Sequence, residues 1–266
     1  MQYKREVRPK KSLGQHFLKD LSIAKRIADT IDIFPDLPVL EVGPGTGVLT
    51  RFLLENNRDL TAVELDSESV EYLHKHYPQL EGKIVQKDFL KLNLDEYFSD
   101  SFCVIGNYPY NISSQIFFKV LDYKDKIPCC SGMIQKEVAE RLAAKPGKKA
   151  YGIITVLLQV WYTIDYLFTV EAEVFDPPPK VKSAVIRMVR NERKVLECSE
   201  SLLKTIVKMA FNQRRKTMRN SLRSLVGKDN NLLNDPVFNM RPEQLSVEEF
   251  IELTQKIDNS LAPVGY

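Results

Sequence analysis

Hydrophobic residues in the first two-thirds of the chain follow two alternating patterns. Short apolar runs with the length of strands are separated by segments in which apolar residues recur every three or four positions, as on one face of a helix. The strand-like runs lie at 39–42, 61–64, 84–86, 102–105, 133–135, 163–170 and 183–189. Because strands that alternate with helices usually pair in parallel, the pattern predicts an α/β fold with a doubly wound sheet.

The helical segments have recognisable faces and starts. A helix is predicted just before the first strand, with an apolar face formed by Ile23, Ile27, Ala28 and Ile31. We expect Ser67 to cap the helix after the second strand, because a serine hydroxyl can accept a hydrogen bond from the free N–H groups at a helix start. The strongly apolar segment 152–161 predicts a buried helix.

A charged run at 190–194 interrupts the alternation and indicates a domain boundary. Beyond it the apolar spacing is helical throughout, and Ser246 and Glu249 have the spacing of a capping box. The predicted organisation has three parts, which are a basic N-terminal arm at 1–20, a sheet domain at 21–190 and a helical domain at 191–266.

Charge changes this picture only locally. Lys and Arg together number 38 against 35 for Asp and Glu, which leaves a net charge of +3. The segment 201–228, however, contains eight basic residues and no acidic one. Such a local excess indicates contact with an anionic partner.

Cysteine usage and apolar run lengths exclude several classes of protein. The four cysteines lack the spacing of a disulfide framework or a zinc site, so we expect reduced thiols, a cytosolic compartment and no metal. Charges interrupt every apolar run before it is long enough to span a membrane, so we expect no membrane partner.

The first predicted strand runs into a glycine turn, Gly43–Gly47. Glycines allow a sharp turn and a close approach of the backbone to a ligand, although a turn that binds nothing would look the same. Glu64 and Asp88 follow at the ends of the next two strands. A carboxylate at the first position can accept hydrogen bonds from ribose, and one at the second from an adenine amine, so the set favours a nucleoside site.

A second turn, Asn107–Tyr110, follows the fourth strand. A base amine is a poor nucleophile because its lone pair is delocalised into the ring. The Asn107 side-chain oxygen and the Tyr108 carbonyl can accept its two hydrogens and favour a pyramidal nitrogen. Pro109 stiffens the turn, and Tyr110 offers a face on which a flipped base can stack. A rigid aromatic turn without a substrate is the alternative, which the position at a strand end disfavours.

Two more motifs leave their roles open. Phe175 begins a stiff loop with three prolines and either closes the second face of the base or fills the core beneath the loop. The segment 211–223 reads as one basic helix, on which Arg215, Arg219 and Arg223 would share a face. Nucleic acid, an anionic membrane or solvent could each explain that face, and the excess of arginine favours phosphate.

Together these motifs resemble those of the ribosomal RNA adenine dimethyltransferases, from the N-terminal arm to the last helix. The matching motifs are Lys11–Leu18, Glu41–Gly45, Glu64, Asp88, Asn107–Tyr110, Phe175–Val181 and Phe211–Lys216. Two positions depart from the family's usual pattern, in which asparagine is more common than His16 and leucine more common than Tyr108.

The resemblance implies a Rossmann-like class I S-adenosylmethionine-dependent methyltransferase fold with a small C-terminal all-helical domain. With the glycine turn included, the expected contacts to S-adenosylmethionine come from His16, Leu18, Gly43, Gly45, Glu64, Asp88 and Asn107. The expected catalytic residues are Asn107, Tyr108, Pro109, Tyr110 and Phe175. The expected RNA-binding residues are Arg214, Arg215, Lys216, Arg219 and Arg223.

The resemblance also implies the substrate, which is two adjacent adenosines in a hairpin near the 3′ end of small-subunit (16S) rRNA, each methylated twice. The expected partner is that RNA within an assembling 30S subunit in the cytoplasm, and we expect a monomer. The alternatives are a large-subunit rRNA adenine methyltransferase of the macrolide-resistance type and a non-catalytic ribosome assembly factor. The triple-proline loop and the run Gln213–Lys216 favour the small-subunit enzyme, and the glycine spacing disfavours a dehydrogenase.

Overall fold

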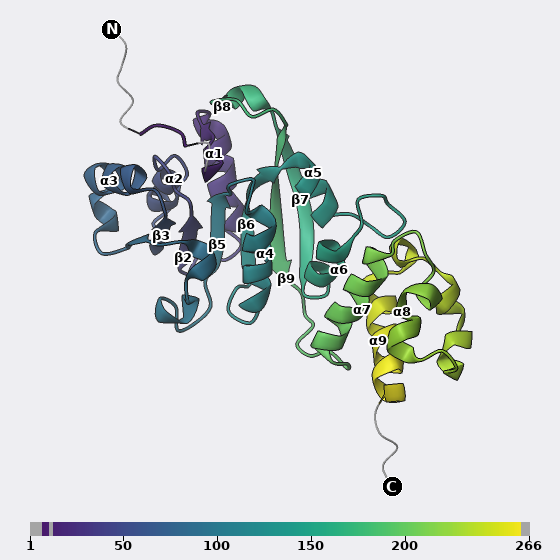
Figure 1. Cartoon of the computed structure of the whole chain (residues 1–266). Helices are drawn as coiled ribbons and strands as arrows, with labels where there is room; N and C mark the ends of the chain where they lie inside the picture. Colours follow the sequence, from purple (N-terminus) through teal and green to yellow (C-terminus); the bar gives the residue numbers. More distant parts are fainter. Residues whose placement is uncertain (1–6, 11–12, 262–266) are drawn as a thin grey trace. The chain divides into compact units, whose positions relative to one another are not determined.

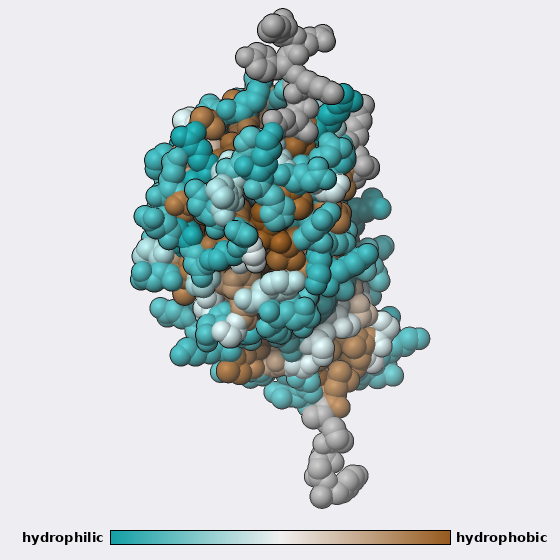
Figure 2. Space-filling view, turned by 90° about the vertical axis from the view of Figure 1, so that its left-hand side faces the viewer, coloured by the Kyte–Doolittle hydropathy of each residue, from teal (hydrophilic) through white to brown (hydrophobic). Residues whose placement is uncertain are grey.

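The computed structural model describes residues 7–10 and 13–261, so Lys11, Ser12 and the first six residues of the expected arm lie outside the described part. The chain divides into two compact units. One unit runs to Ala139 and adds Thr163–Arg190, and the other combines Glu140–Tyr162 with the chain from Asn191 onward. Figure 2 shows a face on which polar side chains predominate, with apolar side chains visible between them.

A seven-stranded sheet in the order β4-β3-β2-β5-β6-β9-β7 forms the centre of the first unit (Figure 1). Its strands are β2 (Val39–Val42), β3 (Leu60–Glu64), β4 (Ile84–Gln86), β5 (Cys103–Asn107), β6 (Cys129–Gln135), β7 (Tyr162–Val170) and β9 (Ser183–Arg190). The pairs from β4 to β6 are parallel, whereas β6 and β9 are antiparallel. The predicted α/β fold is therefore confirmed, and the antiparallel β9 departs from the parallel pairing that the alternation predicted.

Five helices accompany these strands along the chain. They are α1 (Leu21–Ala28), α2 (Thr50–Glu55), α3 (Ser67–His76), α4 (Ser113–Asp122) and α5 (Lys136–Leu142). All four residues of β2 are buried, as expected for a central strand whose two faces are covered. Ile27 of α1 and Leu53 of α2 belong to the same apolar cluster as Val39 of β2.

The start of α3 differs from the prediction. Asp66 stands at the N-cap in an extended conformation, and Ser67 is already the first helical residue. Because only the residue before the first helical turn can cap it, the expected role of Ser67 was wrong. The Asp66 carboxylate instead accepts a hydrogen bond from the Ser69 hydroxyl at 3.0 Å.

Two very short strands escaped the sequence pattern. β1 (Phe17–Leu18) pairs antiparallel with β8 (Phe175–Asp176), and the Lys19 amide donates to the Val174 carbonyl at 2.8 Å. A two-residue strand is too short to show alternation. The pairing fixes the residues before α1 against the start of the triple-proline loop.

The strand order creates a switch point beside β2. After β2 the chain adds β3 and β4 on one side of it and then returns to place β5 on the other side. At such a point the connections leave in opposite directions, and a crevice opens at the carboxyl ends of the strands. Gly43 and Asn107 lie at these ends of β2 and β5.

The second unit is helical. Its helices are α6 (Ile153–Gln159), α7 (Glu200–Asn212), α8 (Met218–Val226) and α9 (Val247–Leu261). The capping box of α9 is confirmed, because the Ser246 amide donates to Glu249 at 2.7 Å and the Glu249 amide donates back to the Ser246 hydroxyl at 3.2 Å. The unit also contains α6, which the chain reaches before the predicted boundary at 190.

The basic segment is not one helix, so the predicted common face of Arg215, Arg219 and Arg223 was wrong. α7 ends at Asn212, a turn follows, and α8 begins at Met218 after an extended Thr217. The two apolar stripes explain the break, since at 3.6 residues per turn they would lie about a quarter turn apart on a continuous helix. The break lets the α7 stripe around Ile206 and the α8 stripe around Leu222 both be buried.

Candidate active site

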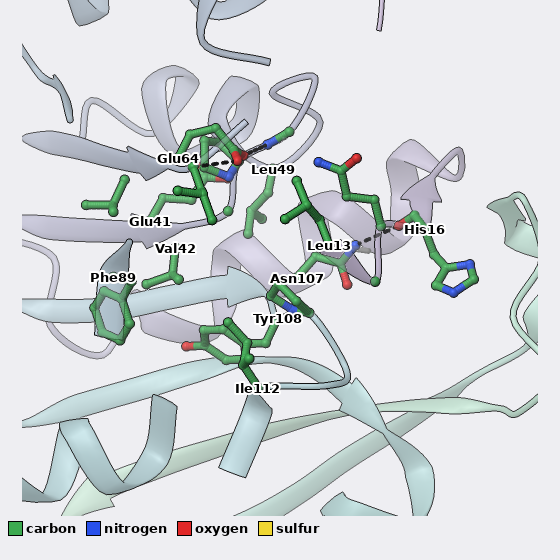
Figure 3. A pocket seen from close by; sticks show the side chains of 18 of the residues that line it. Leu13, His16, Glu41, Val42, Leu49, Glu64, Phe89, Asn107, Tyr108 and Ile112 are labelled. Atoms are coloured by element: carbon green, nitrogen blue, oxygen red, sulfur yellow. Dashed lines mark hydrogen bonds between the residues drawn. The ribbon is translucent and has the colours of Figure 1, made fainter. Parts of the chain in front are cut away.

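A cavity lies at the carboxyl ends of β2 to β5, within the first unit (Figure 3). Its walls come from five segments that are far apart in the sequence. The lining residues fall within Leu13–Leu18, Glu41–Leu49, Val63–Leu65, Lys87–Leu90 and Asn107–Ile112, with Ile27 in addition. The sheet therefore brings the predicted glycine turn, the two predicted carboxylates and the predicted catalytic turn to one place.

The glycine turn has a conformation that other residues rarely adopt. Gly43, Gly45 and Gly47 have φ angles of +69°, +57° and +77°. A Cβ at Gly45 would lie 3.0 Å from the Phe17 ring, and one at Gly47 would lie 2.4 Å from the Tyr77 ring. Glycine is thus required both for the turn and for the space beside it.

Glu64 ends β3 with its carboxylate fixed by the backbone. One oxygen accepts hydrogen bonds from the amides of Leu65 and Asp66, at 2.8 and 2.9 Å, and the other accepts one from Gly45 at 3.0 Å. Burial raises the pKa of Glu64, and these hydrogen bonds oppose that rise. A carboxylate oxygen has two lone pairs, so the oxygen beside Gly45 can still accept from a hydroxyl in the cavity.

Glu41 is a cavity residue that the sequence analysis did not single out for a role. It lies in β2, is 1% exposed, and accepts a hydrogen bond from the Thr50 hydroxyl at 2.6 Å. Burial raises the pKa of Glu41 to about 8. The available signal was an acidic residue inside an otherwise apolar strand, because buried acids are rare unless they serve a site.

Asp88 stands two residues beyond β4, at the edge of the cavity. One of its carboxylate oxygens caps the following turn by accepting from the Leu90 amide at 3.0 Å. The Asp88 side chain is 32% exposed to solvent. Phe89 and Leu65 also line the cavity, so a carboxylate acceptor is combined with apolar walls.

Asn107 has its two amide atoms in different roles. Its Nδ2 donates to the His16 carbonyl at 3.3 Å (Figure 3), and no described residue donates to Oδ1, which can therefore accept a hydrogen bond. The side-chain amide is oriented by the residue that precedes β1 rather than by solvent. This orientation suits the predicted role of Oδ1 as an acceptor for an amine.

Tyr108 points into the protein, not into the cavity. Its hydroxyl donates to the Ser131 carbonyl at 2.8 Å, and the residue is 1% exposed. The ring fits against two glycines, since a Cβ at Gly106 or Gly132 would lie 3.0 or 2.6 Å from it. Only the backbone of Tyr108 can serve a substrate, which agrees with the predicted use of its carbonyl.

Of the two aromatic residues expected around the base, Tyr110 lines the cavity and Phe175 lies in the core. Tyr110 lines the cavity, stacks against the His16 ring at 5.5 Å and bonds to the Ser183 hydroxyl at 2.5 Å. Phe175 is 1% exposed and belongs to the core cluster that contains Leu18. Of the two alternatives for Phe175, this structure therefore has the ring filling the core, and we assign it no contact with substrate.

His16 contributes its backbone to the cavity wall, but its imidazole is used elsewhere. Nδ1 lies 2.8 Å from the Pro177 carbonyl, to which it must donate because a carbonyl only accepts. In Figure 3 the ring is directed away from the other labelled side chains. A contact between the imidazole and a cofactor is not part of this arrangement.

The basic residues of the helical unit are unequal in their exposure. Arg214 is held within the unit, where it donates to the Lys148 carbonyl at 3.2 Å and lies 3.9 Å from Glu243. Arg215, Lys216 and Arg223 are exposed and Arg219 is half-buried. Arg214 thus has an internal role that the sequence pattern did not reveal.

Residues 7–10 and 13–261 lack two features that would point to other functions. No helix there is long and apolar enough to cross a membrane. The same residues contain no group of three or more His, Cys, Asp and Glu side chains arranged to hold a metal ion. All four cysteines are free, and three of them are buried.

Sequence comparison finds extensive similarity to known proteins. The family model described as ribosomal RNA adenine dimethylase matches residues 7–259. Proteins named ribosomal RNA small subunit methyltransferase A are similar over nearly the whole chain. The one from Parabacteroides distasonis is 69% identical over 250 residues, which is 94% of each chain. The one from Bacteroides fragilis is 63% identical over 96% of this chain and 94% of its own.

Solved structures show the same fold. A dimethyladenosine transferase from Plasmodium falciparum has a TM-score of 0.79 at 22% identity and covers 92% of this chain and 98% of its own. The 23S rRNA methyltransferase ErmE has a TM-score of 0.68 at 29% identity, with 90% and 99% covered.

Proposed function

This chain belongs to the ribosomal RNA adenine dimethylase family, and we propose that its cavity holds S-adenosylmethionine while the Asn107 turn presents an adenine amine to it. The protein is an S-adenosylmethionine-dependent methyltransferase with the class I fold. It dimethylates adenine in small-subunit rRNA. The observation that carries this conclusion is the family match from residue 7 to 259, together with relatives of 63–69% identity.

The residues around the cavity fit the proposed cofactor. Gly43 and Gly45 line the cavity with backbone and no side chain, and such turns accept ligands close to the backbone. Glu64 is suited to accept from ribose hydroxyls, and Asp88 from the adenine amine, with Phe89 and Leu65 as apolar walls. Leu18 is buried and would form part of the apolar wall of the site.

The chemistry requires little of the protein beyond orientation. When bound, S-adenosylmethionine supplies an electrophilic methyl group, so neither a covalent enzyme intermediate nor a metal is needed. In the first transfer, Asn107 Oδ1 and the Tyr108 carbonyl would accept the two amine hydrogens and turn the nitrogen lone pair toward that methyl group. Holding the reactants in line accounts for much of the rate gain available to such an enzyme. The methylated amine is acidic enough to lose its proton to water.

The substrate base would stack on the exposed part of Tyr110. Pro109 keeps the turn rigid, so that Asn107 and Tyr110 hold fixed positions on either side of it. The two adjacent adenosines near the 3′ end of 16S rRNA would bind here one after the other, and each would receive two methyl groups. We further propose that the protein works as a monomer, in the cytoplasm, on an assembling 30S subunit.

RNA phosphates would contact cations of the helical unit that are exposed or half-buried. Arg215, Lys216, Arg219 and Arg223 form no ion pair with an acidic side chain of the described residues. A group of cations without neighbouring acids suits a phosphate backbone. Arg214 would act indirectly, by holding the turn between α7 and α8 against the loop at Lys148.

Methyl transfer from labelled S-adenosylmethionine to immature 30S subunits tests this function, with the modified bases mapped afterwards. We expect dimethyladenosine at two adjacent positions near the 3′ end of 16S rRNA, and much slower formation of it with Asn107→Ala. Label in 23S rRNA would instead favour the macrolide-resistance activity, to which the likeness to ErmE draws attention. Cofactor binding without any transfer would favour a non-catalytic assembly factor.

A further inference from the structure

The segment from Asp88 to Phe98 follows β4 and packs against α4, and one end of it lines the cavity. Asp88, Phe89 and Leu90 are cavity residues, whereas the far end, at Asp95 and Phe98, is not. Buried apolar side chains fix the depth of this segment, since Phe89 is 4% exposed and Leu94 is fully buried. Apolar contacts have no direction, so they do not set the orientation of the backbone.

Three side chains in and just after α4 hold this segment by polar contacts. Lys119 Nζ donates to the carbonyls of Leu90 at 3.2 Å and Leu92 at 2.5 Å. The Tyr123 hydroxyl accepts from the Leu94 amide at 3.2 Å. Lys126 Nζ contacts Asp95 at 2.6 Å and the Phe98 carbonyl at 3.1 Å.

Lys119 differs from Lys126 in the surroundings of its ammonium group, which is partly buried beside two aromatic rings. Its Nζ lies 5.6 Å from the centre of the Phe89 ring and 5.7 Å from that of Tyr123. Burial lowers the pKa of Lys119. Within the described residues its hydrogen-bond partners are two carbonyl oxygens, and no carboxylate lies within ion-pair distance.

A solvated lysine would avoid the cost of partial burial, so its position needs a compensating interaction. Two charge-assisted hydrogen bonds to carbonyls and two ring faces supply one. Because both carbonyls belong to the turn that Asp88 begins, the ammonium fixes the direction in which that turn leaves β4. Asp88 in turn caps the same turn through the Leu90 amide.

We propose that Lys119 is a positioning residue, which fixes the backbone at Leu90 and so holds Asp88 at the cavity. It touches neither cofactor nor substrate, and it acts through the loop that would receive the adenine. The inference rests on the proposed binding of S-adenosylmethionine in this cavity. α4 directly follows the Asn107–Tyr110 turn, so one helix supports both the adenine side and the amine side of the site.

Lys119→Met tests the proposal, because it keeps an apolar stem of similar length and removes the ammonium. We expect the dissociation constant for S-adenosylhomocysteine, measured by calorimetry, to rise roughly tenfold, the loss typical of a charged hydrogen bond. In methyl transfer to immature 30S subunits, KM for S-adenosylmethionine should rise by a similar factor. The turnover number at saturating cofactor should stay close to that of the unchanged protein, because Asn107 and Tyr108 are not moved.

Lys126→Met is the matched control. It removes a lysine that binds the same segment, but at the end that does not line the cavity. We expect it to lower the melting temperature of the free protein without changing cofactor affinity. Lys119→Arg should restore most of the affinity, since it keeps a cation that can donate to both carbonyls. If Lys119→Met does not fold, Lys119→Gln provides the same comparison.

A double-mutant cycle with Asp88→Ala identifies the route of the effect. If Lys119 acts by holding Asp88, the affinity of the double variant will fall by less than the product of the two separate factors. Equal reductions of affinity in Lys119→Met and Lys126→Met would overturn the proposal, as would a fall in turnover at unchanged KM or an unchanged affinity in Lys119→Met. Failure of the proposed function differs, because then the unchanged protein itself would bind no S-adenosylhomocysteine.

Discussion

Asn107 is the residue on which the proposed chemistry most depends. The His16 carbonyl holds its amide nitrogen, so its oxygen is presented in a fixed direction. Orientation by a single contact at 3.3 Å means that the side chain can be removed without unfolding the turn, whose backbone is held by the Tyr108 amide on the Met133 carbonyl. The role of Asn107 can therefore be tested apart from the fold.

Asn107→Ala should lower the turnover number by about 10²-fold, if Oδ1 acts like one oriented hydrogen bond in the transition state. Binding of S-adenosylhomocysteine should change little by comparison. Single-turnover kinetics and calorimetry measure the two effects. Near-normal turnover under saturating cofactor and RNA would refute the amine-binding role, while the family assignment would stand. Asn107→Asp is a sharper comparison, since it keeps an acceptor but adds charge beside a cationic cofactor.

Tyr108 stabilises the same turn from beneath. Tyr108→Phe removes the hydroxyl that donates to the Ser131 carbonyl and leaves that buried acceptor with one partner fewer. We expect a decrease of about 1–2 kcal/mol in the free energy of unfolding, with an unchanged denaturant slope. A midpoint equal to that of the unchanged protein would show that the buried hydroxyl contributes nothing to the fold.

Glu41 gives a prediction about pH. Its pKa is about 8 in the folded protein against an ordinary value of 4.5, so the folded state holds a proton that the unfolded state releases between these values. The stability from its neutral form is complete below 4.5 and is lost as pH rises through about 8. The melting temperature should therefore fall over this range relative to that of Glu41→Gln, which stays neutral. Parallel curves for the two proteins would contradict the assignment.

At the scale of elements, the break between α7 and α8 decides which cations are available. Arg215 lies in the turn, whereas Arg219 and Arg223 lie on α8. The three arginines therefore do not share the one helix face that the sequence spacing predicted. The segment 201–228 still carries no acidic residue, and two of its four arginines, Arg215 and Arg223, are exposed. We therefore still propose that these cations contact RNA phosphates, but from a turn and a short helix and not from one continuous helix.

Replacing Arg215, Arg219 and Arg223 together should weaken RNA binding and make its dependence on salt less steep, by about one unit of slope for each phosphate that is no longer neutralised. Filter binding at several salt concentrations measures this. A control that replaces Lys25, Arg51 and Lys83 takes away equal charge from cations that are already paired with carboxylates. The same change of slope in both variants would indicate a general effect of net charge.

At the scale of the whole molecule, the helical unit draws on two separate parts of the chain. α6 is buried along most of its length, and it packs with α7 inside this unit. A chain truncated after Arg190 would retain α6 but lack α7, α8 and α9. α6, whose Ile154, Leu157 and Leu158 are buried in the full chain, would then lose its packing against α7.

We therefore expect the truncated chain 1–190 to aggregate or to melt well below the full-length protein, because several buried Leu and Ile side chains contribute roughly 1.5–3 kcal/mol each. Circular dichroism during heating, with sedimentation to detect aggregates, measures this. A truncated chain that melts at the same temperature as the full protein would show that α6 does not depend on the helices after residue 190.

Some residues of the candidate site can be predicted from local patterns in the sequence. The strand runs, the glycine turn, Glu64, Asp88 and Asn107 could be found in the sequence, because a strand, a turn and a strand end each leave a mark within a few residues. The parallel order then places them at one edge of the sheet. The prediction of Ser67 as the cap was wrong by one residue, because Asp66 is the N-cap. Sequence patterns do not locate the end of a helix to within one residue.

The sequence by itself determined the α/β class, the positions of the main strands and several residues of the candidate site, because these follow from periodicity and from glycine's special conformations. The tertiary structure alone decided that Tyr108 and Phe175 turn into the core, that His16 binds Pro177 and that Lys119 reaches Leu90. It also decided that α6 joins the helical unit. The contacts of His16 and Lys119 join residues that are 161 and 29 positions apart along the chain. Contacts at such separations are set by how the elements pack, and no local pattern records them.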